Sequence, residues 1–127
     1  TILIEALNSS DFPDYLLPTT ADAARIVETV AEPNCRLQLD LYHLRRSLAP
    51  GEEAAELVER FLPLAAHVQV ANPVGRREPG ESCVALLKLV DDLGYAGCVG
   101  CEYKPTAGSM AESLRWAAPF GIHCPSS

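Results

Sequence analysis

The chain has 127 residues, of which 48% are hydrophobic and 21% are charged, a composition typical of one globular domain with its own core. Seventeen acidic against ten basic residues give a net charge of −7 at pH 7, which argues against nucleic acid as a partner. The composition excludes a disordered chain, a membrane-spanning protein and a collagen-like fibre.

In chain order, short apolar runs alternate with segments of helical periodicity, which predicts parallel strands joined by crossover helices. The predicted elements are a strand at 2–7, a helix from Ala23 to Val30, a strand at 37–41, a helix from Ala54 to Leu62, a strand at 67–71, a helix from Cys83 to Val90, a strand at 98–103 and a helix from Ser109. We expect each strand to be apolar on both faces, as in a sheet covered by helices.

Capping residues mark two of the helix ends. Gly94 follows the third helix and is expected to take the left-handed conformation of a C-terminal cap. Ser109 and Glu112 have capping-box spacing at the start of the fourth helix, which Pro119 is expected to end. The organisation is therefore β-α repeated four times in one domain over residues 1–127, with a loose tail at 124–127.

The cysteine content and the chain start bear on location. Five cysteines, an odd number lying mostly in apolar segments, favour a reducing compartment, and no targeting segment is evident, so the chain is predicted to be cytoplasmic. Cys98 and Cys101 have C-x-x-C spacing, but residues three apart on a strand point to opposite faces. We expect them to pack in the core, with a redox or zinc role as the alternative.

Each predicted strand carries one polar residue able to bind a metal ion: Glu5, Asp40, Gln69 and Glu102. They recur at intervals of about one strand-helix unit of a (β/α) barrel. A carboxylate loses several kcal/mol on burial unless it is paired or bound to a cation, so we predict a shared divalent metal site. Three carboxylates and one amide suit Mg²⁺ or Mn²⁺ better than zinc. Taken alone, each acidic residue has an alternative interpretation: it is a solvated residue at the end of a strand, or it caps a helix.

Two further polar residues follow the strands and are predicted to bind substrate. His43 comes shortly after Asp40 at a strand-to-loop junction, and Arg76 lies in the loop after Gln69, where barrel loops face the active site. The alternatives are a buried histidine in the core and a solvated loop. His67 is expected to be core or to support a ligand, and His123 is given no role.

Several stretches of the chain resemble the C-terminal half of the hydroxypyruvate isomerase family, within the xylose isomerase-like TIM-barrel superfamily. The matching stretches are 4–8 (IEALN), 37–43 (LQLDLYH), 67–71 (HVQVA), 75–76 (GR), 78–80 (EPG), 93–95 (LGY) and 99–105 (VGCEYKP). The resemblance implies an α/β fold of (β/α)8 TIM-barrel type, of which this chain provides strands five to eight.

The same resemblance implies roles for individual residues. Glu5 and Glu102 match the glutamates that donate and accept the proton, and these two with Asp40 and Gln69 match the metal ligands. His43 and Arg76 match the substrate-facing positions of related isomerases and epimerases. The implied reaction is the metal-assisted interconversion of hydroxypyruvate and tartronate semialdehyde (2-hydroxy-3-oxopropanoate) through an enediolate. Glutamine at position 69 favours this branch, because related ketose 3-epimerases usually have histidine there.

Three alternative functions remain open from the sequence. The first is a related isomerase or epimerase acting on a longer sugar or oxo-acid, and the second is a metal-dependent DNA-repair endonuclease, against which the net charge argues. The third is a non-catalytic half-barrel. Four strands cannot close an eight-stranded barrel, so we expect exposed apolar surface at Leu3, Ile4, Val70 and Val99. The chain is then predicted to need an N-terminal half-barrel, to self-associate or to aggregate.

Overall fold

The computed structural model describes residues 1–122, which form a parallel four-stranded sheet in the order β1-β2-β3-β4. The strands are β1 (Ile2–Glu5), β2 (Cys35–Asp40), β3 (Ala65–Val70) and β4 (Val99–Cys101). Neighbours in sequence are neighbours in the sheet, which is the order of strands in a (β/α) barrel. The predicted α/β class and the half-barrel architecture are confirmed, while His123 and residues 124–127 lie outside the described residues.

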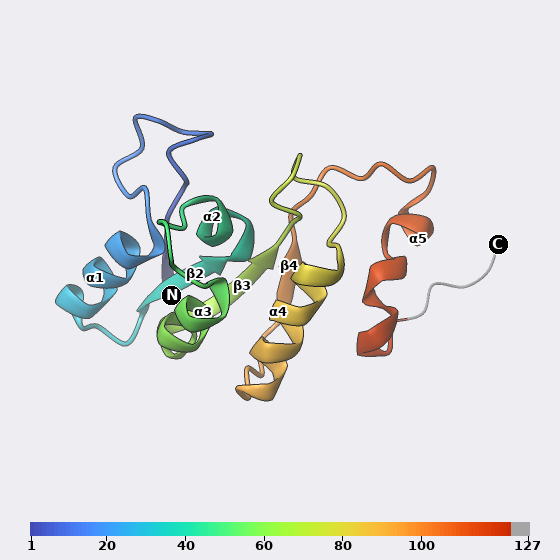
Figure 1. The fold of residues 1–127 in the computed structure, drawn as a ribbon. Helices are drawn as coiled ribbons and strands as arrows, with labels where there is room; N and C mark the ends of the chain where they lie inside the picture. Colours follow the sequence, from blue (N-terminus) through green and yellow to red (C-terminus); the bar gives the residue numbers. More distant parts are fainter. Residues whose placement is uncertain (123–127) are drawn as a thin grey trace.

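Three helices, α1 (Thr20–Val30), α3 (Ala54–Phe61) and α4 (Glu81–Asp92), lie along one face of the sheet (Figure 1). The single-turn 3-10 helix η1 (Leu62–Leu64) links α3 to β3. The core forms between these helices and the strand residues that face them: Leu37, Leu39, Val68 and Val70. All four are fully buried, because each lies at an alternate position of a strand whose side chains enter the helical layer.

The opposite face of the sheet is polar, so the expectation that each strand is apolar on both faces is wrong. Arg36, Gln38 and His67 lie on this face beside the predicted ligands and are partly exposed. The helices cover the other face, so hydrated polar side chains are tolerated here. The expected exposure of Val70 is also wrong, since Val70 packs under the helices with 0% exposure.

Leu3 and Val99 are exposed as expected, at 37% and 36%, and both lie on the outermost strands β1 and β4. Ile4 is half-buried against the core. These two side chains therefore lie at the edges of the sheet, where each outer strand also has an unpaired side, while Leu16 and Val74 are exposed in loops.

The ends of the helices agree with the predicted caps, with one difference. Gly94 has φ +80°, and the Ser109 hydroxyl accepts a hydrogen bond from the Glu112 N–H. The fourth helix is not continuous, because it divides into α5 (Met110–Ser113) and the 3-10 helix η2 (Arg115–Phe120), which contains Pro119. An α-helical turn at this proline would clash with the carbonyl group of Arg115, four residues earlier.

The helix α2 (Leu41–Arg46) was not predicted. The second strand was expected to continue to Leu41, but it ends at Asp40, whose carboxylate accepts a hydrogen bond from the Tyr42 N–H and begins the helix. His43 therefore lies in a helix rather than in a loop. This difference matters for the site, because one helical turn brings His43 back toward Asp40.

The cysteines divide into two groups among the described residues. Cys35 and Cys83 are buried, as expected for core packing, whereas Cys98 and Cys101 are exposed, so the core expectation is wrong for this pair. The reason is that β4 is an edge strand that the helices cover only partly. Within residues 1–122, no helix is both long enough and apolar enough to cross a membrane.

Candidate functional site

The carboxyl ends of all four strands, and the loops that follow them, lie at one end of the sheet, at the top of Figure 1. Glu5 and Asp40 are the last residues of β1 and β2, and Glu102 directly follows β4. Asp40 pairs in register with Gln69, and Gln69 pairs with Gly100. The parallel topology thus brings the four predicted metal ligands to one edge.

Asp40 is the most buried carboxylate of the site, with 4% of its surface exposed. Its Oδ1 accepts the Tyr42 N–H at 2.7 Å, while Oδ2 is buried with no hydrogen-bond partner in the described part of the chain. Burial raises the pKa of Asp40 to about 6, opposed by the Tyr42 hydrogen bond and reinforced by the negative charge of Glu5. A buried, unpartnered carboxylate oxygen indicates a place for a cation or a proton.

Glu5, Asp40 and His43 each offer a ligand atom within 4.8 Å of the others. Burial raises the pKa of Glu5, while a side-chain hydrogen bond from Gln38 and the charge of Arg76 oppose the rise. Two carboxylates at this separation repel each other unless a cation lies between them or a proton is shared. The two carboxylates therefore offer oxygen donors and negative charge of the kind that suits a hard divalent ion.

The hydrogen bonds of His43 fix which ring nitrogen carries its proton. Nδ1 lies 3.1 Å from the backbone N–H of Asn8, which can only donate, and 2.8 Å from the Asn8 side-chain nitrogen. Burial lowers the pKa of His43 to about 4, so the ring is neutral at pH 7. Nδ1 is therefore the acceptor and Nε2 carries the proton.

The protonated Nε2 of His43 lies 3.8 Å from Asp40 Oδ2 and has no hydrogen-bond partner among residues 1–122. A metal ligand needs a free lone pair. The ring's free lone pair is on Nδ1, where it accepts the Asn8 hydrogen bonds, so Nε2 has none to offer a metal ion. The arrangement favours a hydrogen-bond donor at position 43 over a metal ligand. The substrate-binding role predicted for this residue from the sequence stays a prediction.

Arg76 lies between the carboxylates. Its Nη2 is 2.9 Å from Glu102 Oε1 and 3.8 Å from Asp40 Oδ2, and its guanidinium carbon lies 4.8 Å from the centre of the Tyr42 ring. The residue has φ +52°, in the left-handed region that non-glycine residues rarely adopt. The structure therefore directs this arginine into the site, whereas the neighbouring Arg77 is exposed.

The loop that carries Arg76 is held to the loop after β4. The Arg76 carbonyl oxygen accepts the Lys104 N–H at 2.7 Å, and the Glu78 carboxylate accepts the N–H groups of Thr106 and Ala107. These hydrogen bonds lower the pKa of Glu78 to about 2. Glu78 thus links the two loops on which Arg76 and Glu102 are carried.

Gln69 and Glu102 complete the predicted set. The Gln69 side-chain oxygen accepts a hydrogen bond from Gln38 Nε2 at 2.6 Å, and Glu102 has 54% of its side chain exposed. The structure brings Glu5, Asp40 and His43 directly together, connects Glu102 to them through Arg76, and places Gln69 beside Asp40 on the sheet. His67 is half-buried on the same face and is the register partner of Gln38.

Sequence reasoning missed several residues of the site. Asn8 and Asp11 follow β1, and Asp11 accepts hydrogen bonds from the Tyr42 hydroxyl and the Asn8 amide. Gln38 hydrogen-bonds Gln69 and lowers the pKa of Glu5. The alternation of β2 could have indicated Gln38, because it shares the parity of Asp40, but the contacts of Asn8 and Tyr42 depend on segments far apart in sequence.

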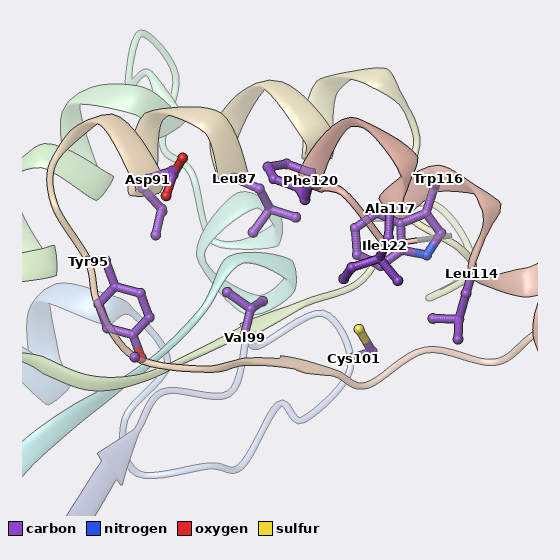
Figure 2. Close-up of a pocket in the computed structure, with 12 residues that line it drawn as sticks. Leu87, Asp91, Tyr95, Val99, Cys101, Leu114, Trp116, Ala117, Phe120 and Ile122 are labelled. Atoms are coloured by element: carbon purple, nitrogen blue, oxygen red, sulfur yellow. The ribbon is translucent and has the colours of Figure 1, made fainter. Parts of the chain in front are cut away.

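An apolar groove of about 260 Å³ lies away from this cluster, on the helix-covered side of β4 (Figure 2). Val99 and Cys101 of β4, side chains of α4, and Trp116 and Phe120 of η2 line it. Burial raises the pKa of the Cys101 thiol. The groove lacks the cluster of ligand atoms found at the carboxyl end of the sheet, so the candidate site is the carboxylate cluster.

Comparison with known proteins agrees with the fold. The family described as "Xylose isomerase-like TIM barrel" matches residues 1–120. A Homo sapiens protein named "Putative hydroxypyruvate isomerase" is 41% identical over 123 residues, covering 93% of this chain and 43% of that protein. A "2-oxo-tetronate isomerase" of Cupriavidus necator is 37% identical over 123 residues, covering 94% of this chain and 46% of that protein.

Among solved structures, the crystal structure of AP endonuclease, family 2, from Brucella melitensis is similar to this chain with a TM-score of 0.83 and 35% identity. The match covers 94% of this chain and 46% of that one. The chain spans less than half the length of the relatives it matches. By its sequence match and its parallel half-barrel, the chain belongs to the xylose isomerase-like TIM-barrel family.

Proposed function

We propose that this chain carries the catalytic edge of a metal-dependent isomerase that interconverts hydroxypyruvate and tartronate semialdehyde. The observation that supports it most is the buried Asp40 oxygen, unpartnered among the described residues, within reach of Glu5 and beside Arg76. The name of the Homo sapiens relative points to the same reaction. The oxygen-rich donor set favours Mg²⁺ or Mn²⁺.

Glu5, Asp40, Gln69 and Glu102 are the residues that would hold the ion. When bound, a divalent ion supplies positive charge that stabilises the oxygen atoms of an enediolate. The fit rests on the chemistry of the residues: two carboxylates lie close together, one has an unpartnered buried oxygen, and an amide oxygen is nearby. Binding of the ion would also remove the repulsion between Glu5 and Asp40.

The isomerisation requires one proton transfer from carbon and one to carbon. One carboxylate removes a proton from C3 of hydroxypyruvate, a proton is added at C2, and the hydroxyl proton moves from O3 to O2, so atoms and charge balance. We assign the carbon protons to Glu5 and Glu102, which exchange the roles of base and acid in the two directions. Burial raises the pKa of Glu5, which makes its protonated form more accessible.

His43 and Arg76 are proposed to hold the substrate. The Nε2–H of His43 is a buried donor without a partner in residues 1–122, suited to a substrate oxygen. The planar guanidinium of Arg76 can bind the substrate carboxylate through two hydrogen bonds. In the free chain it pairs with Glu102 at 2.9 Å, so a substrate carboxylate would compete with Glu102 for the guanidinium.

We also propose that activity requires a second half-barrel. The unpaired sides of β1 and β4 and the exposed Leu3 and Val99 are suited to strands that close the sheet. An N-terminal half-barrel or a second copy of this chain could provide them. Either would cover the polar face and exclude water from the carboxylate cluster.

A four-carbon oxo-acid is the second candidate substrate, because the Cupriavidus necator relative is named 2-oxo-tetronate isomerase. The Brucella melitensis structure is described as an AP endonuclease, but the net charge of −7 opposes binding of this chain to DNA. Comparison of turnover on hydroxypyruvate, on four- to six-carbon substrates and on abasic-site DNA separates these candidates.

The test joins this chain to the N-terminal half of the Homo sapiens relative, whose matching region is 41% identical. We refer to this as the joined protein. With Mg²⁺ or Mn²⁺ we expect it to convert hydroxypyruvate, to lose activity with a chelator and to regain it with metal. Glu102→Gln should abolish turnover while the circular dichroism spectrum is unchanged. A folded joined protein without turnover, or a fully active Glu102→Gln variant, refutes the proposal.

A further inference from the structure

We infer that Gln38 is a positioning residue that sets the orientation of the Gln69 amide, so that Gln69 offers its oxygen rather than its nitrogen to a divalent cation. The inference rests on the proposed function, because it concerns how the ligand set is prepared. Gln38 is not among the residues expected to touch the ion.

The sheet register places Gln38 between two of the proposed ligands. Gln38 is the register partner of Glu5 on β1 and lies two residues before Asp40, the register partner of Gln69. All four side chains project from the polar face, because alternate residues of a strand share a face. Gln38 Nε2 donates to Gln69 Oε1 at 2.6 Å, and the Gln38 side chain lowers the pKa of the Glu5 carboxylate, against the rise caused by burial.

Donor and acceptor rules fix both amides. An ionised Glu5 carboxylate only accepts hydrogen bonds, so beside this register partner the NH2 group of Gln38 is favoured over its oxygen. The Gln38 NH2 group donates to Gln69, which therefore accepts with its side-chain oxygen. The Gln69 oxygen has two lone pairs, one of which remains for a cation.

Without Gln38, the charges at the site favour the opposite orientation of Gln69. Glu5 and Asp40 present carboxylate oxygens, and Asp40 Oδ2 lacks a hydrogen-bond partner within residues 1–122. An unrestrained Gln69 amide would turn its NH2 group toward these acceptors, which is the wrong atom for a metal ligand. Gln38 prevents this rotation because its NH2 group, on β2, donates a hydrogen bond to the Gln69 oxygen.

The β4 side of Gln69 offers no equivalent contact in the described part of the chain. The register partner of Gln69 there is Gly100, and a Cβ atom at position 100 would lie 3.1 Å from Gln69 Cγ and 2.9 Å from His67 Nε2. Glycine leaves the room that the Gln69 side chain occupies but has no side-chain group to hold the amide. The hydrogen bond from Gln38 is therefore the contact that sets the amide.

The experiment measures Mn²⁺ binding, by electron paramagnetic resonance of the free ion, in the 127-residue chain and in the joined protein. Gln38→Met keeps the length of the side chain but removes both donors, and we expect a 10- to 100-fold loss of Mn²⁺ affinity, roughly the effect of removing an outer-shell partner. Gln38→Asn, which withdraws the donors but stays polar, serves as a second variant if the first does not fold. Arg36→Met, on the same strand and face as Gln38 but directed at the carbonyl groups of Pro63, Leu64 and Ala65, is the matched control and should bind as the unchanged chain does.

A double-mutant cycle separates this role from a general structural one. In a Gln69→Met background, Gln38→Met should cause a clearly smaller loss, because Gln38 acts chiefly through the Gln69 amide. Full affinity in Gln38→Met, or an equal loss in both backgrounds, overturns the inference and leaves the proposed function standing. Absence of Mn²⁺ binding in the unchanged chain and the unchanged joined protein instead refutes the proposed metal site itself.

Discussion

Asp40→Asn is expected to stabilise the metal-free chain while removing one of the proposed ligands of the ion. Asp40 is 4% exposed and its pKa is raised from 3.8 to about 6, chiefly by burial. At 1.36 kcal/mol for each pKa unit, the ionised carboxylate costs the folded state about 3 kcal/mol. Asparagine keeps the oxygen that caps α2. Its NH2 group faces the His43 Nε2–H, and because both are hydrogen-bond donors this costs about 1 kcal/mol. The free energy of unfolding is therefore expected to rise by about 2 kcal/mol.

The sign of the pH dependence follows from the direction of the shift. Because the folded chain binds the Asp40 proton more tightly than the unfolded chain, stability falls as pH rises from about 4 through 6. Below pH 4 the carboxyl group is protonated in both states and the cost is absent. The advantage of Asp40→Asn should therefore appear between pH 4 and 6 and be complete above pH 6.

The assay is urea unfolding followed by circular dichroism, at one protein concentration and with a chelator, at several pH values from 4 to 7. Added Mn²⁺ should reverse the order of stability at pH 7, because only the unchanged chain gains binding energy. A stability difference that does not vary with pH, or a variant less stable than the unchanged chain at pH 7, would refute the reasoning about the buried carboxylate.

Three other outcomes are expected. Arg76→Gln should tighten Mn²⁺ binding about tenfold, because the guanidinium charge 3.8 Å from Asp40 Oδ2 is removed and Glu102 loses its ion pair. The same change should raise KM for the substrate in the joined protein. Weaker Mn²⁺ binding would contradict this reasoning. Leu39→Ala, at a fully buried position, should lower the free energy of unfolding by about 3 kcal/mol in urea titrations, and a loss below about 1 kcal/mol would count against the assigned core. Sedimentation of the 127-residue chain should show dimers or larger species, since both outer strands are unpaired; a monodisperse monomer would exclude the expected association.

The regular elements were predictable because their signals are local. The stripe of Cys83, Leu86, Leu87 and Val90 follows helical periodicity, and all four are buried in α4 as expected. The helix α2 was missed because six residues are too few to show a period. Only its cap at Asp40 marks its start, and an aspartate at the end of a strand is equally typical of a turn or of a solvated sheet edge.

The candidate site could be predicted as a set of residues but not as an arrangement. Glu5, Asp40, Gln69 and Glu102 could be proposed as ligands because each interrupts or follows an apolar strand. Their partners could not, because the contacts are long-range. The proton position of His43 depends on Asn8, 35 residues earlier, and the direction of Arg76 depends on Glu102, 26 residues later. Neither relation leaves a local pattern in the sequence.

The groove beside β4 contains the single tryptophan of the sequence. Trp116 is half-buried, its indole N–H lies 3.3 Å from the Tyr103 hydroxyl, and its ring meets the Tyr103 ring edge-on. Its fluorescence therefore originates from one place, on the side of the sheet away from the carboxylate cluster. A partner that closes the edge of β4 would exclude water from this groove and shift the Trp116 emission to shorter wavelength. Cation binding at the opposite face of the sheet would leave the emission unchanged. Barrel closure and metal binding can thus be followed separately in the same sample.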